Sequence, residues 1–497
     1  MMKQFFFLLV MLVLGGNLMG QDAQTTFTNP ILEGDYPDPT IMREGNDFYM
    51  THSAFDYLPG LTVFHSVDLI HWEPISAALT TYLGHAWAAD ISKYGSKYYI
   101  YFTVYPKGNF VVYADSPYGP WSEPVNLNIK GIDPCHVIDE TGQRWLFLSG
   151  GNRVKLADDG LSVIGKFEQV YKGWQYPKDW KVEGTYLEGP KLKKIGEYYY
   201  YISAQGGTAG PATSHMAVVA RSKSLAGPWE NAPNNPLIHT YSASEKWWSK
   251  GHGSLVDLPD GSWWIVYHGY AKDFRGLGRQ TLLEPISIGA DGWLVAPLEA
   301  KMDQPIQAPL PLMQRYDRYD KLPDFRIGRE WKYYKKYDSS RASVKRGILT
   351  LQAQDSTVHS SAPLLFVAGV KSYEVRFKIQ ADAGATAGVV LFYNDKAYLG
   401  AGFDSKMIYN WENTKKSDVQ ARIGTRPLWF KIRNEQQIVC IWYSFDGKRW
   451  IPSVMDKDVT DYNHNIWKDF QSLLPGVFAY GAGKVKISDF EFTVHEH

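Results

Sequence analysis

The sequence predicts an all-β protein in which a five-bladed β-propeller is followed by a β-sandwich. A turn glycine with an aromatic residue three positions later recurs five times between residues 45 and 264, at spacings of 47 to 65 residues. The glycines are Gly45, Gly95, Gly142, Gly196 and Gly261. Repeats of this length, with glycine turns and short aromatic-rich runs, are typical of radial β architectures. Strand-like runs without this repeat follow from about residue 316, and no long amphipathic helix is predicted.

A polar residue stands five to nine positions before each turn glycine. These residues are Asp38, Asp90, Asp133, Glu188 and His252. Each one belongs to the strand that enters the hairpin. If that strand is the innermost of its blade, the five side chains converge on one axial pocket, as the radial arrangement requires.

The first twenty residues are interpreted as a signal peptide. Lys3 supplies a positive start, and residues 5–14 form an apolar run of ten, which is too short to span a bilayer. No cysteine follows the run, so we expect an exported protein, periplasmic or secreted, without a lipid anchor. Cys135 and Cys440 are the only cysteines, and we expect both to be free and buried.

The length of 497 residues requires more than one domain. We predict a propeller over residues 21–300, a Pro-rich linker over 301–315 and the sandwich over 316–497. Several runs in the last region alternate apolar and polar residues, as half-buried antiparallel strands do. These runs lie at residues 347–351, 372–379, 387–393, 439–443 and 485–492.

Charge and aromatic content narrow the classes of partner. Lys and Arg together number 52, as do Asp and Glu, so there is no basic field for nucleic acid or an anionic membrane. No membrane span is predicted. The chain has 18 Trp, 33 Tyr and 23 Phe. Aromatic residues suit β-sheets, and they also offer flat faces on which sugar rings stack.

Three carboxylates share a local pattern. Asp38, Asp133 and Glu188 each lie beside Pro or Gly at the start of a predicted blade. Any one of them alone is explained as a turn former, but three at matching repeat positions favour function. Glycoside hydrolysis requires two carboxyl groups across a pocket, one protonated and one ionised. A third carboxylate would raise the pKa of the acid by like-charge repulsion.

These residues carry a resemblance to glycoside hydrolase family 43. The stretches from Asn29-Pro30-Ile31 to Asp38-Pro39-Thr40, Ile132-Asp133-Pro134 and Glu188-Gly189-Pro190 resemble its three catalytic signatures. Further similar motifs occur in order, so the resemblance covers about residues 27–300. They include Gly251-His252-Gly253 and Leu277-Gly278-Arg279-Gln280-Thr281. The region after residue 316 resembles the concanavalin-like, jelly-roll sandwich found in one branch of that family.

The resemblance implies an inverting mechanism with Asp38 as general base, Glu188 as general acid and Asp133 as the residue that tunes and orients the acid. It implies that Arg279 reaches a sugar hydroxyl and that no cofactor is required. It also places His252 near the axis, where some members hold a structural calcium ion. Phe55 and Trp87 are candidates to stack on the terminal sugar, with aromatic core as the competing interpretation.

Three other acids are candidates for lesser roles. Asp90 stands at a repeat position, but the resemblance assigns it no proton transfer, so we expect it to be structural. Asp35 and Glu183 lie close in sequence to the catalytic candidates. We interpret both as supporting or solvated residues.

The predicted function is an exo-acting inverting glycoside hydrolase that releases terminal α-L-arabinofuranosyl residues from plant hemicellulose or its oligosaccharides. The alternative is a β-D-xylosidase acting on xylo-oligosaccharides, and no residue type in the chain separates the two sugars. A fructan-cleaving propeller hydrolase is disfavoured by Ile132 before Asp133 and by Gly189 after Glu188. A non-catalytic carbohydrate-binding propeller has no need of the three carboxylates. The sandwich is either a sugar-binding module or a partner whose loop closes the pocket.

Overall fold

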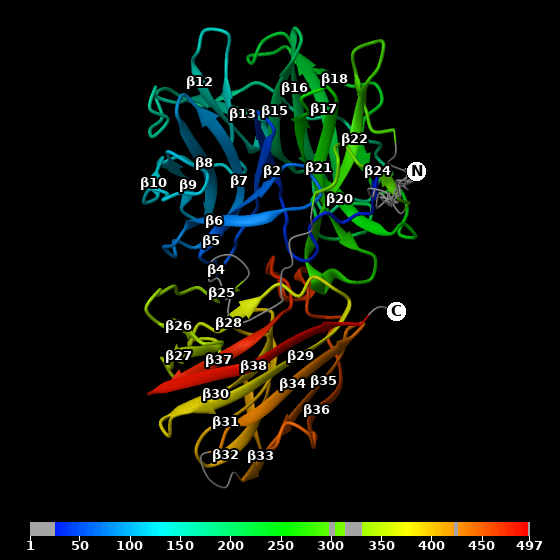
Figure 1. The fold of residues 1–497 in the computed structure, drawn as a ribbon. Helices are drawn as coiled ribbons and strands as arrows, with labels where there is room; N and C mark the ends of the chain where they lie inside the picture. The colour runs from blue at the N-terminus through cyan, green and yellow to red at the C-terminus, as the bar shows by residue number, and fades with distance from the viewer. Residues whose placement is uncertain (1–24, 298–303, 314–330, 422–425, 496–497) are drawn as a thin grey trace, which may run out of the picture.

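The computed structural model describes residues 25–297, 304–313, 331–421 and 426–495. Figure 1 shows two β-rich bodies, the first in blue to green and the second in yellow to red. The prediction of a five-bladed propeller followed by a sandwich is confirmed. The predicted signal peptide, residues 1–20, lies outside the described residues.

Four four-stranded sheets and one five-stranded sheet, all antiparallel, form the five blades of the propeller in the described part of the chain. The innermost strands lie next to one another around the axis, and each pairs with a second strand across a tight hairpin. The innermost strands are β2 (Thr40–Glu44), β7 (His85–Tyr94), β11 (Cys135–Ile138), β15 (Leu187–Ile195) and β20 (Trp247–Asp257). The second strands are β3 (Asp47–Thr51), β8 (Lys97–Tyr105), β12 (Arg144–Leu148), β16 (Tyr198–Gln205) and β21 (Trp263–Ala271).

The third and fourth strands complete each blade and vary in length from two to ten residues. The third strands are β5 (Gly60–Ser66), β9 (Gly108–Ala114), β13 (Asn152–Lys155), β17 (Met216–Ser222) and β22 (Arg279–Ile288). The outermost strands are β6 (Glu73–Leu79), β10 (Val125–Asn126), β14 (Glu168–Gln169), β18 (Glu230–Asn231) and β23 (Leu294–Val295). A further short strand, β19 (Ile238–His239), pairs with β17, and the 3-10 turns η1 (Ser149–Gly151) and η2 (Arg275–Leu277) lie between strands.

The five repeated glycines occupy the turns between the first and second strands of the blades. All five have positive φ, between 59° and 86°, and a Cβ at any of them would meet no atom within 4 Å. Glycine is therefore required by the left-handed backbone of the turn and not by lack of space. The aromatic three positions later begins the buried run of the second strand, as Phe48 and Tyr98 do.

Two sheets make up the sandwich. One has the order β33-β32-β31-β30-β37-β28-β25-β4 and the other β26-β27-β38-β29-β34-β35-β36. The first contains β25 (Trp331–Tyr334), β28 (Leu364–Phe366), β30 (Ala385–Phe392), β31 (Tyr398–Phe403), β32 (Met407–Glu412), β33 (Lys415–Ala421) and β37 (Leu474–Gly481). The second contains β26 (Ala342–Lys345), β27 (Ile348–Gln352), β29 (Ser372–Ala381), β34 (Leu428–Glu435), β35 (Ile438–Ser444), β36 (Ile451–Asp458) and β38 (Lys484–Val494).

Alternating apolar side chains of the two sheets fill the space between them. Val375 and Phe377 of β29 pack in one cluster with Val389 and Leu391 of β30. The sequence predicted this because each of these strands places every second residue on one face. The described residues contain one α-helix, the single turn α1 (His464–Trp467). No helix in this part of the chain is long and apolar enough to cross a membrane.

Strand pairing joins the two bodies. The short strand β4 (Tyr57–Leu58), which belongs to the propeller sequence, pairs with β25 and extends a sandwich sheet. Within the predicted linker, β24 (Ile306–Gln307) pairs with β1 (Thr26–Phe27) at the start of the propeller. The expectation that both cysteines are buried is wrong for Cys440, which is half-buried on β35, whereas Cys135 is buried and both are free.

Candidate active site

All seven predicted site residues line one pocket of about 220 Å³ at the propeller axis. Those residues are Asp38, Phe55, Trp87, Asp133, Glu188, His252 and Arg279. Asp38 and Asp133 precede β2 and β11 by two residues, whereas Glu188 and His252 lie within β15 and β20. The innermost strands therefore bring together side chains that are up to 214 residues apart in sequence, counted from Asp38 to His252.

Left-handed backbone conformations turn these residues toward the axis. Asp38 has a φ of 56°, Asp133 of 57° and His252 of 54°. Gly189, directly after Glu188, has a φ of 54°. Non-glycine residues in this region carry strain that persists where the surroundings impose it, commonly at functional sites. A left-handed residue at the inward-facing side chain, or directly after it, therefore recurs in four of the five blades.

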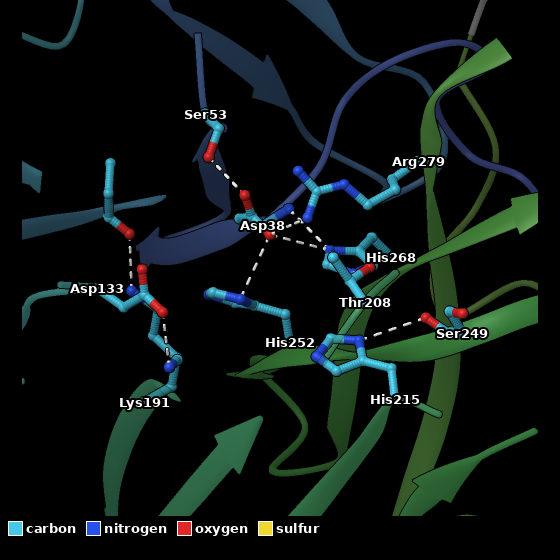
Figure 2. A network of polar contacts seen from close by, with 12 residues as sticks. Asp38, Ser53, Asp133, Lys191, Thr208, His215, Ser249, His252, His268 and Arg279 are labelled. Atoms are coloured by element: carbon cyan, nitrogen blue, oxygen red, sulfur yellow. Dashed lines mark hydrogen bonds and ion pairs between the residues drawn. The ribbon is translucent and has the colours of Figure 1, made fainter. Parts of the chain in front are cut away.

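Four side chains surround the carboxylate of Asp38 (Figure 2). Arg279 Nη1 lies 2.9 Å from Oδ1, and Ser53 Oγ donates to Oδ2 at 2.5 Å. His252 Nδ1 and His268 Nδ1 lie 3.3 Å and 3.1 Å from Oδ1. Burial alone would raise the pKa of Asp38, but the Arg279 guanidinium, which is the largest opposing influence, holds it well below its usual range.

The two histidines beside Asp38 are neutral near physiological pH. Burial lowers the pKa of His252 to about 4 and that of His268 to about 3. His268 Nε2 is 3.1 Å from Thr208 Oγ1, and its Nδ1 accepts a hydrogen bond from the backbone N–H of Asp38 at 3.0 Å. His268 therefore fixes the backbone of Asp38 as well as packing beside its side chain.

Asp133 and Glu188 form a coupled pair on the other side of the pocket. Burial and the charge of Asp38 raise the pKa of Asp133. Burial, followed by the charges of Asp133 and Asp38, raises the pKa of Glu188 to about 8. The backbone N–H of Gly189 donates to Asp133 Oδ2 at 2.9 Å, which favours the ionised form of Asp133. The proton of the pair therefore resides on Glu188 near neutral pH.

Asp90 is the one residue of the repeat pattern that does not line the pocket. Its carboxylate accepts hydrogen bonds from Lys191 Nζ at 2.9 Å and from the backbone N–H of His136 at 2.9 Å. Both side chains of the Asp90–Lys191 pair are more than nine-tenths buried. Lys191 also donates to the carbonyl of Ala89 at 2.7 Å and to that of Pro134 at 3.3 Å, so this lysine of the fourth blade links the second and third blades to its own.

An aromatic wall closes the pocket on the side of Arg279. Phe55 and Phe470 are stacked with ring centroids 6.4 Å apart, and the Arg279 guanidinium lies 5.0 Å from the Phe470 ring. Trp87 is stacked on Tyr105 at 4.6 Å. Phe470 belongs to the segment between α1 and β37 of the sandwich, so the second body contributes a side chain to the pocket.

Sequence reasoning missed several residues that line the pocket. They are Ala88, Ile132, Tyr186, Gly207, Thr208, His215, His268 and Phe470. His268 and Thr208 have no position in the glycine–aromatic repeat, and nothing in the sequence near Phe470 pointed to the propeller. Glu183, interpreted as a supporting or solvated residue, also lines the pocket. Asp35 lies behind the wall, where its Oδ1 accepts a hydrogen bond from the backbone N–H of Arg279 at 3.0 Å, and burial raises its pKa to about 6.

His252 is the predicted residue near a calcium ion at the axis. His252 Nε2 is buried and has no hydrogen-bond partner. Within the described ranges, no group of three or more His, Cys, Asp or Glu side chains is arranged to hold a metal. Because calcium prefers six to eight oxygen ligands, His252 Nε2 could supply one ligand at most, and an ion there would take its oxygen ligands mainly from water.

Comparisons with known proteins agree with this geometry. The family model of glycosyl hydrolases family 43 matches residues 27–294. A non-reducing end alpha-L-arabinofuranosidase from Bacteroides ovatus is 36% identical over 295 residues, which is 54% of this chain and 53% of that protein. A xylosidase/arabinosidase from Butyrivibrio fibrisolvens is 33% identical over 314 residues, 57% of this chain and 59% of that protein. The chain thus spans about half the length of these curated relatives.

The similarity of the fold extends beyond the propeller. The crystal structure of the GH43 protein BlXynB from Bacillus licheniformis matches with a TM-score of 0.84 and 27% sequence identity. That match covers 95% of this chain and all of the Bacillus chain. The resemblance inferred from the carboxylate signatures is therefore confirmed, and it includes the sandwich.

Proposed function

The chain belongs to glycoside hydrolase family 43, and from that premise we propose that it is an exo-acting inverting glycosidase that releases terminal α-L-arabinofuranosyl residues. The observation that carries the proposal is the opposite displacement of two pKa values within one pocket. The pKa of Asp38 is held well below its usual range, whereas burial and neighbouring charges raise that of Glu188 to about 8. Two carboxyl groups whose environments separate their pKa values can act as base and acid at the same pH.

Asp38 is the proposed general base and Glu188 the proposed general acid. Asp38 takes a proton from a water molecule whose oxygen attacks the anomeric carbon. Glu188 gives its proton to the glycosidic oxygen as the bond from that oxygen to the anomeric carbon breaks. The products are the free sugar with inverted configuration and the leaving group with a new hydroxyl. At the end of the step Asp38 is protonated and Glu188 is ionised.

Asp133 is the proposed positioning residue for the acid. Its charge contributes to the raised pKa of Glu188, and its hydrogen bond from Gly189 fixes the backbone beside the acid. Asp133 stays ionised while Glu188 holds the proton, so Glu188 is kept in its neutral, protonated form near neutral pH. An inverting enzyme needs room for water between base and acid, so we expect the Asp38 and Glu188 carboxyl groups to lie about 6.5–9.5 Å apart.

The proposed exo action rests on the closed side of the pocket. Phe55 and Phe470 are stacked with each other and flank Arg279. A terminal sugar fits against such a wall, but a chain that continues past it does not. We propose that Arg279, besides its ion pair with Asp38, donates to a hydroxyl of the terminal sugar through the remaining N–H groups of its guanidinium. Phe55 and Trp87 are the proposed stacking surfaces.

Arabinose is the first proposed sugar and xylose the second. The relative from Bacteroides ovatus is described as an arabinofuranosidase, and the one from Butyrivibrio fibrisolvens as a xylosidase/arabinosidase. A putative beta-xylosidase from Escherichia coli is 26% identical over 490 residues, 85% of this chain and 90% of that protein. The favoured substrate is therefore an arabinofuranosyl branch of plant hemicellulose, with xylo-oligosaccharides as the alternative.

Calcium and export complete the proposal. A calcium ion held by His252 Nε2 and water molecules would be structural and would carry no step of the reaction. Because the calcium ion is structural, its removal by a chelator should lower the melting temperature. Because we expect no cofactor requirement, the same treatment should not abolish turnover. Residues 1–20 are proposed to direct export, to a periplasm or out of the cell, where plant polysaccharide or its fragments are the partner.

Competition between two substrates tests the choice of sugar. Purified protein would be given 4-nitrophenyl α-L-arabinofuranoside and 4-nitrophenyl β-D-xyloside separately and as a mixture. The proposal expects the larger kcat/KM on the arabinofuranoside. A larger kcat/KM on the xyloside would retain the acid and base but replace the substrate, and turnover of neither would overturn the proposed activity.

A further inference from the structure

One stretch of the pocket wall is not used by the proposed chemistry. Glu183 and Tyr186 line the pocket from the segment that leads into β15, and both are exposed, Tyr186 by 43%. They lie on the strand segment of the proposed acid, five and two residues before Glu188. The wall with Phe55, Arg279 and Phe470 comes from other elements of the chain.

The carboxylate of Glu183 is held in place at the pocket mouth. Its Oε2 accepts a hydrogen bond from the backbone N–H of Ala209 at 2.7 Å. Its own N–H is 2.7 Å from Ser214 Oγ and 2.9 Å from the carbonyl of Gly206. None of the described residues donates to Oε1, so one carboxylate oxygen of a fixed side chain remains available to a ligand.

Gly207 allows Glu183 and Tyr186 to lie against the same backbone. A Cβ at Gly207 would come within 2.5 Å of Glu183 Oε2 and 2.9 Å of Tyr186 Cδ2. The φ of Gly207 is +85°, which also disfavours other residues. Any side chain at position 207 would therefore displace both residues, and the carboxylate and the aromatic ring form one preformed surface.

The chemistry determines which part of the substrate meets this surface. The proton of Glu188 must reach the glycosidic oxygen, which is the first atom of the leaving group. Groups between Glu188 and solvent therefore lie beside the leaving group, whereas groups around Asp38 enclose the sugar that is released. Glu183 and Tyr186 are exposed at the mouth, and the charge of Glu183 is close enough to raise the pKa of Glu188, after the larger effects of burial, Asp133 and Asp38.

We propose that Glu183 and Tyr186 form the binding site for the leaving-group sugar and select an uncharged pyranose there. The inference rests on the proposed function and adds the identity of the unit on the other side of the scissile bond. Glu183 Oε1 accepts hydrogen bonds from ring hydroxyls, and the Tyr186 ring offers an apolar face to the sugar. A uronic acid at the same position meets the negative charge of Glu183 at short range and is rejected.

The test compares substrates with and without a leaving-group sugar. Glu183→Gln keeps the size of the side chain and an oxygen that accepts from Ala209, so the variant should fold as the wild type does. The probes are 4-nitrophenyl α-L-arabinofuranoside, an arabinofuranosyl-substituted xylobiose, and 4-carboxyphenyl α-L-arabinofuranoside. The matched control is Asp179→Asn, which removes an exposed carboxylate from the same segment, outside the pocket.

Loss of hydrogen bonds to a charged acceptor should lower the ratio of kcat/KM for the oligosaccharide to that for the nitrophenyl substrate by about tenfold or more. Relative turnover of the carboxyphenyl glycoside should rise in the same variant. An unchanged ratio in Glu183→Gln, or an equal change in Asp179→Asn, would overturn the inference. The proposed function would still stand in that case, provided that the wild-type protein hydrolyses the arabinofuranoside. Equal losses on all probes would show that Glu183 acts through Glu188 alone. If the wild-type protein hydrolysed neither the arabinofuranoside nor the xyloside, the proposed function and this inference would both be overturned.

Discussion

Arg279 Nη1 lies 2.9 Å from Asp38 Oδ1, and both side chains are more than nine-tenths buried. Asp38 precedes the first blade strand and Arg279 begins the third strand of the last blade, so the ion pair connects the two ends of the propeller. Closing the ring of blades is thus what assembles the proposed base.

Arg279→Met should move the acidic limb of the pH–rate profile to higher pH. Activity requires ionised Asp38 and is lost as pH falls through its pKa. The Arg279 charge is the largest influence that lowers this pKa, so its removal raises the pKa. The measurement is kcat/KM against pH on the nitrophenyl substrate. An acidic limb at the wild-type position would show that another group titrates there.

Asp133→Asn should move the basic limb in the opposite direction. Activity requires protonated Glu188 and is lost as pH rises through its pKa, which burial and neighbouring charges raise to about 8. Removing the charge of Asp133 lowers that pKa, so the basic limb moves to lower pH. The same pH titration of kcat/KM checks it, and a limb displaced to higher pH would contradict the account.

Glu188→Ala should discriminate between leaving groups. A general acid contributes about 10²–10⁴-fold where the leaving oxygen needs a proton. We expect a loss of that order on oligosaccharides and a much smaller loss on aryl glycosides with acidic phenols. Steady-state kinetics across a series of aryl leaving groups measures the difference. Equal losses throughout would remove Glu188 from the role of acid.

Lys191→Met should destabilise the fold without touching the substrate. The change leaves the buried carboxylate of Asp90 without its cation, and breaking a buried pair costs about 3–5 kcal/mol. Urea denaturation followed by tryptophan fluorescence measures the free energy of unfolding. Lys97→Met is the control, because its ion pair with Asp115 is exposed and its loss should be undetectable. Equal effects of the two substitutions would contradict the structural role of the Asp90–Lys191 pair.

Phe470→Ala should raise KM more than it lowers kcat. The ring is stacked between Phe55 and His464, whose ring centroid is 3.6 Å away, and it packs against Arg279. Without it the pocket loses part of its wall for the terminal sugar, although the acid and base remain in place. Kinetics on the nitrophenyl substrate separate the two parameters. An unchanged KM would show that the sandwich does not shape the pocket.

The repeat pattern predicted the blades and the axial residues because both follow from local constraints. A turn glycine marks each hairpin, and the polar residue before it lies within the innermost strand or two residues ahead of it. Asp38, Asp133, Glu188 and His252 meet at the axis for this reason. Asp90 departs from the pattern because its carboxylate pairs with Lys191, a cation on the innermost strand of the fourth blade, whose register the sequence does not specify.

Residues that depend on the contact between the two bodies could not be predicted. Phe470 follows a single helical turn, and no spacing relates it to the blades. Its position results from contacts that bridge the two bodies, such as the hydrogen bond from the backbone N–H of Leu473 to the carbonyl of Gly276. The sequence showed that Glu183 is an acid close to Glu188. Its place at the mouth of the pocket depends on the turn at Gly206 and Gly207, which the sequence does not specify.

The configuration of the first sugar released tests the central claim most directly. Wild-type protein would hydrolyse 4-nitrophenyl α-L-arabinofuranoside inside the spectrometer while proton NMR follows the anomeric signals before mutarotation. With Asp38 as base and Glu188 as acid, the first signal to appear is that of β-L-arabinofuranose, the inverted product. Initial appearance of the α-anomer would contradict the account, because retention requires a carboxylate that attacks the sugar directly.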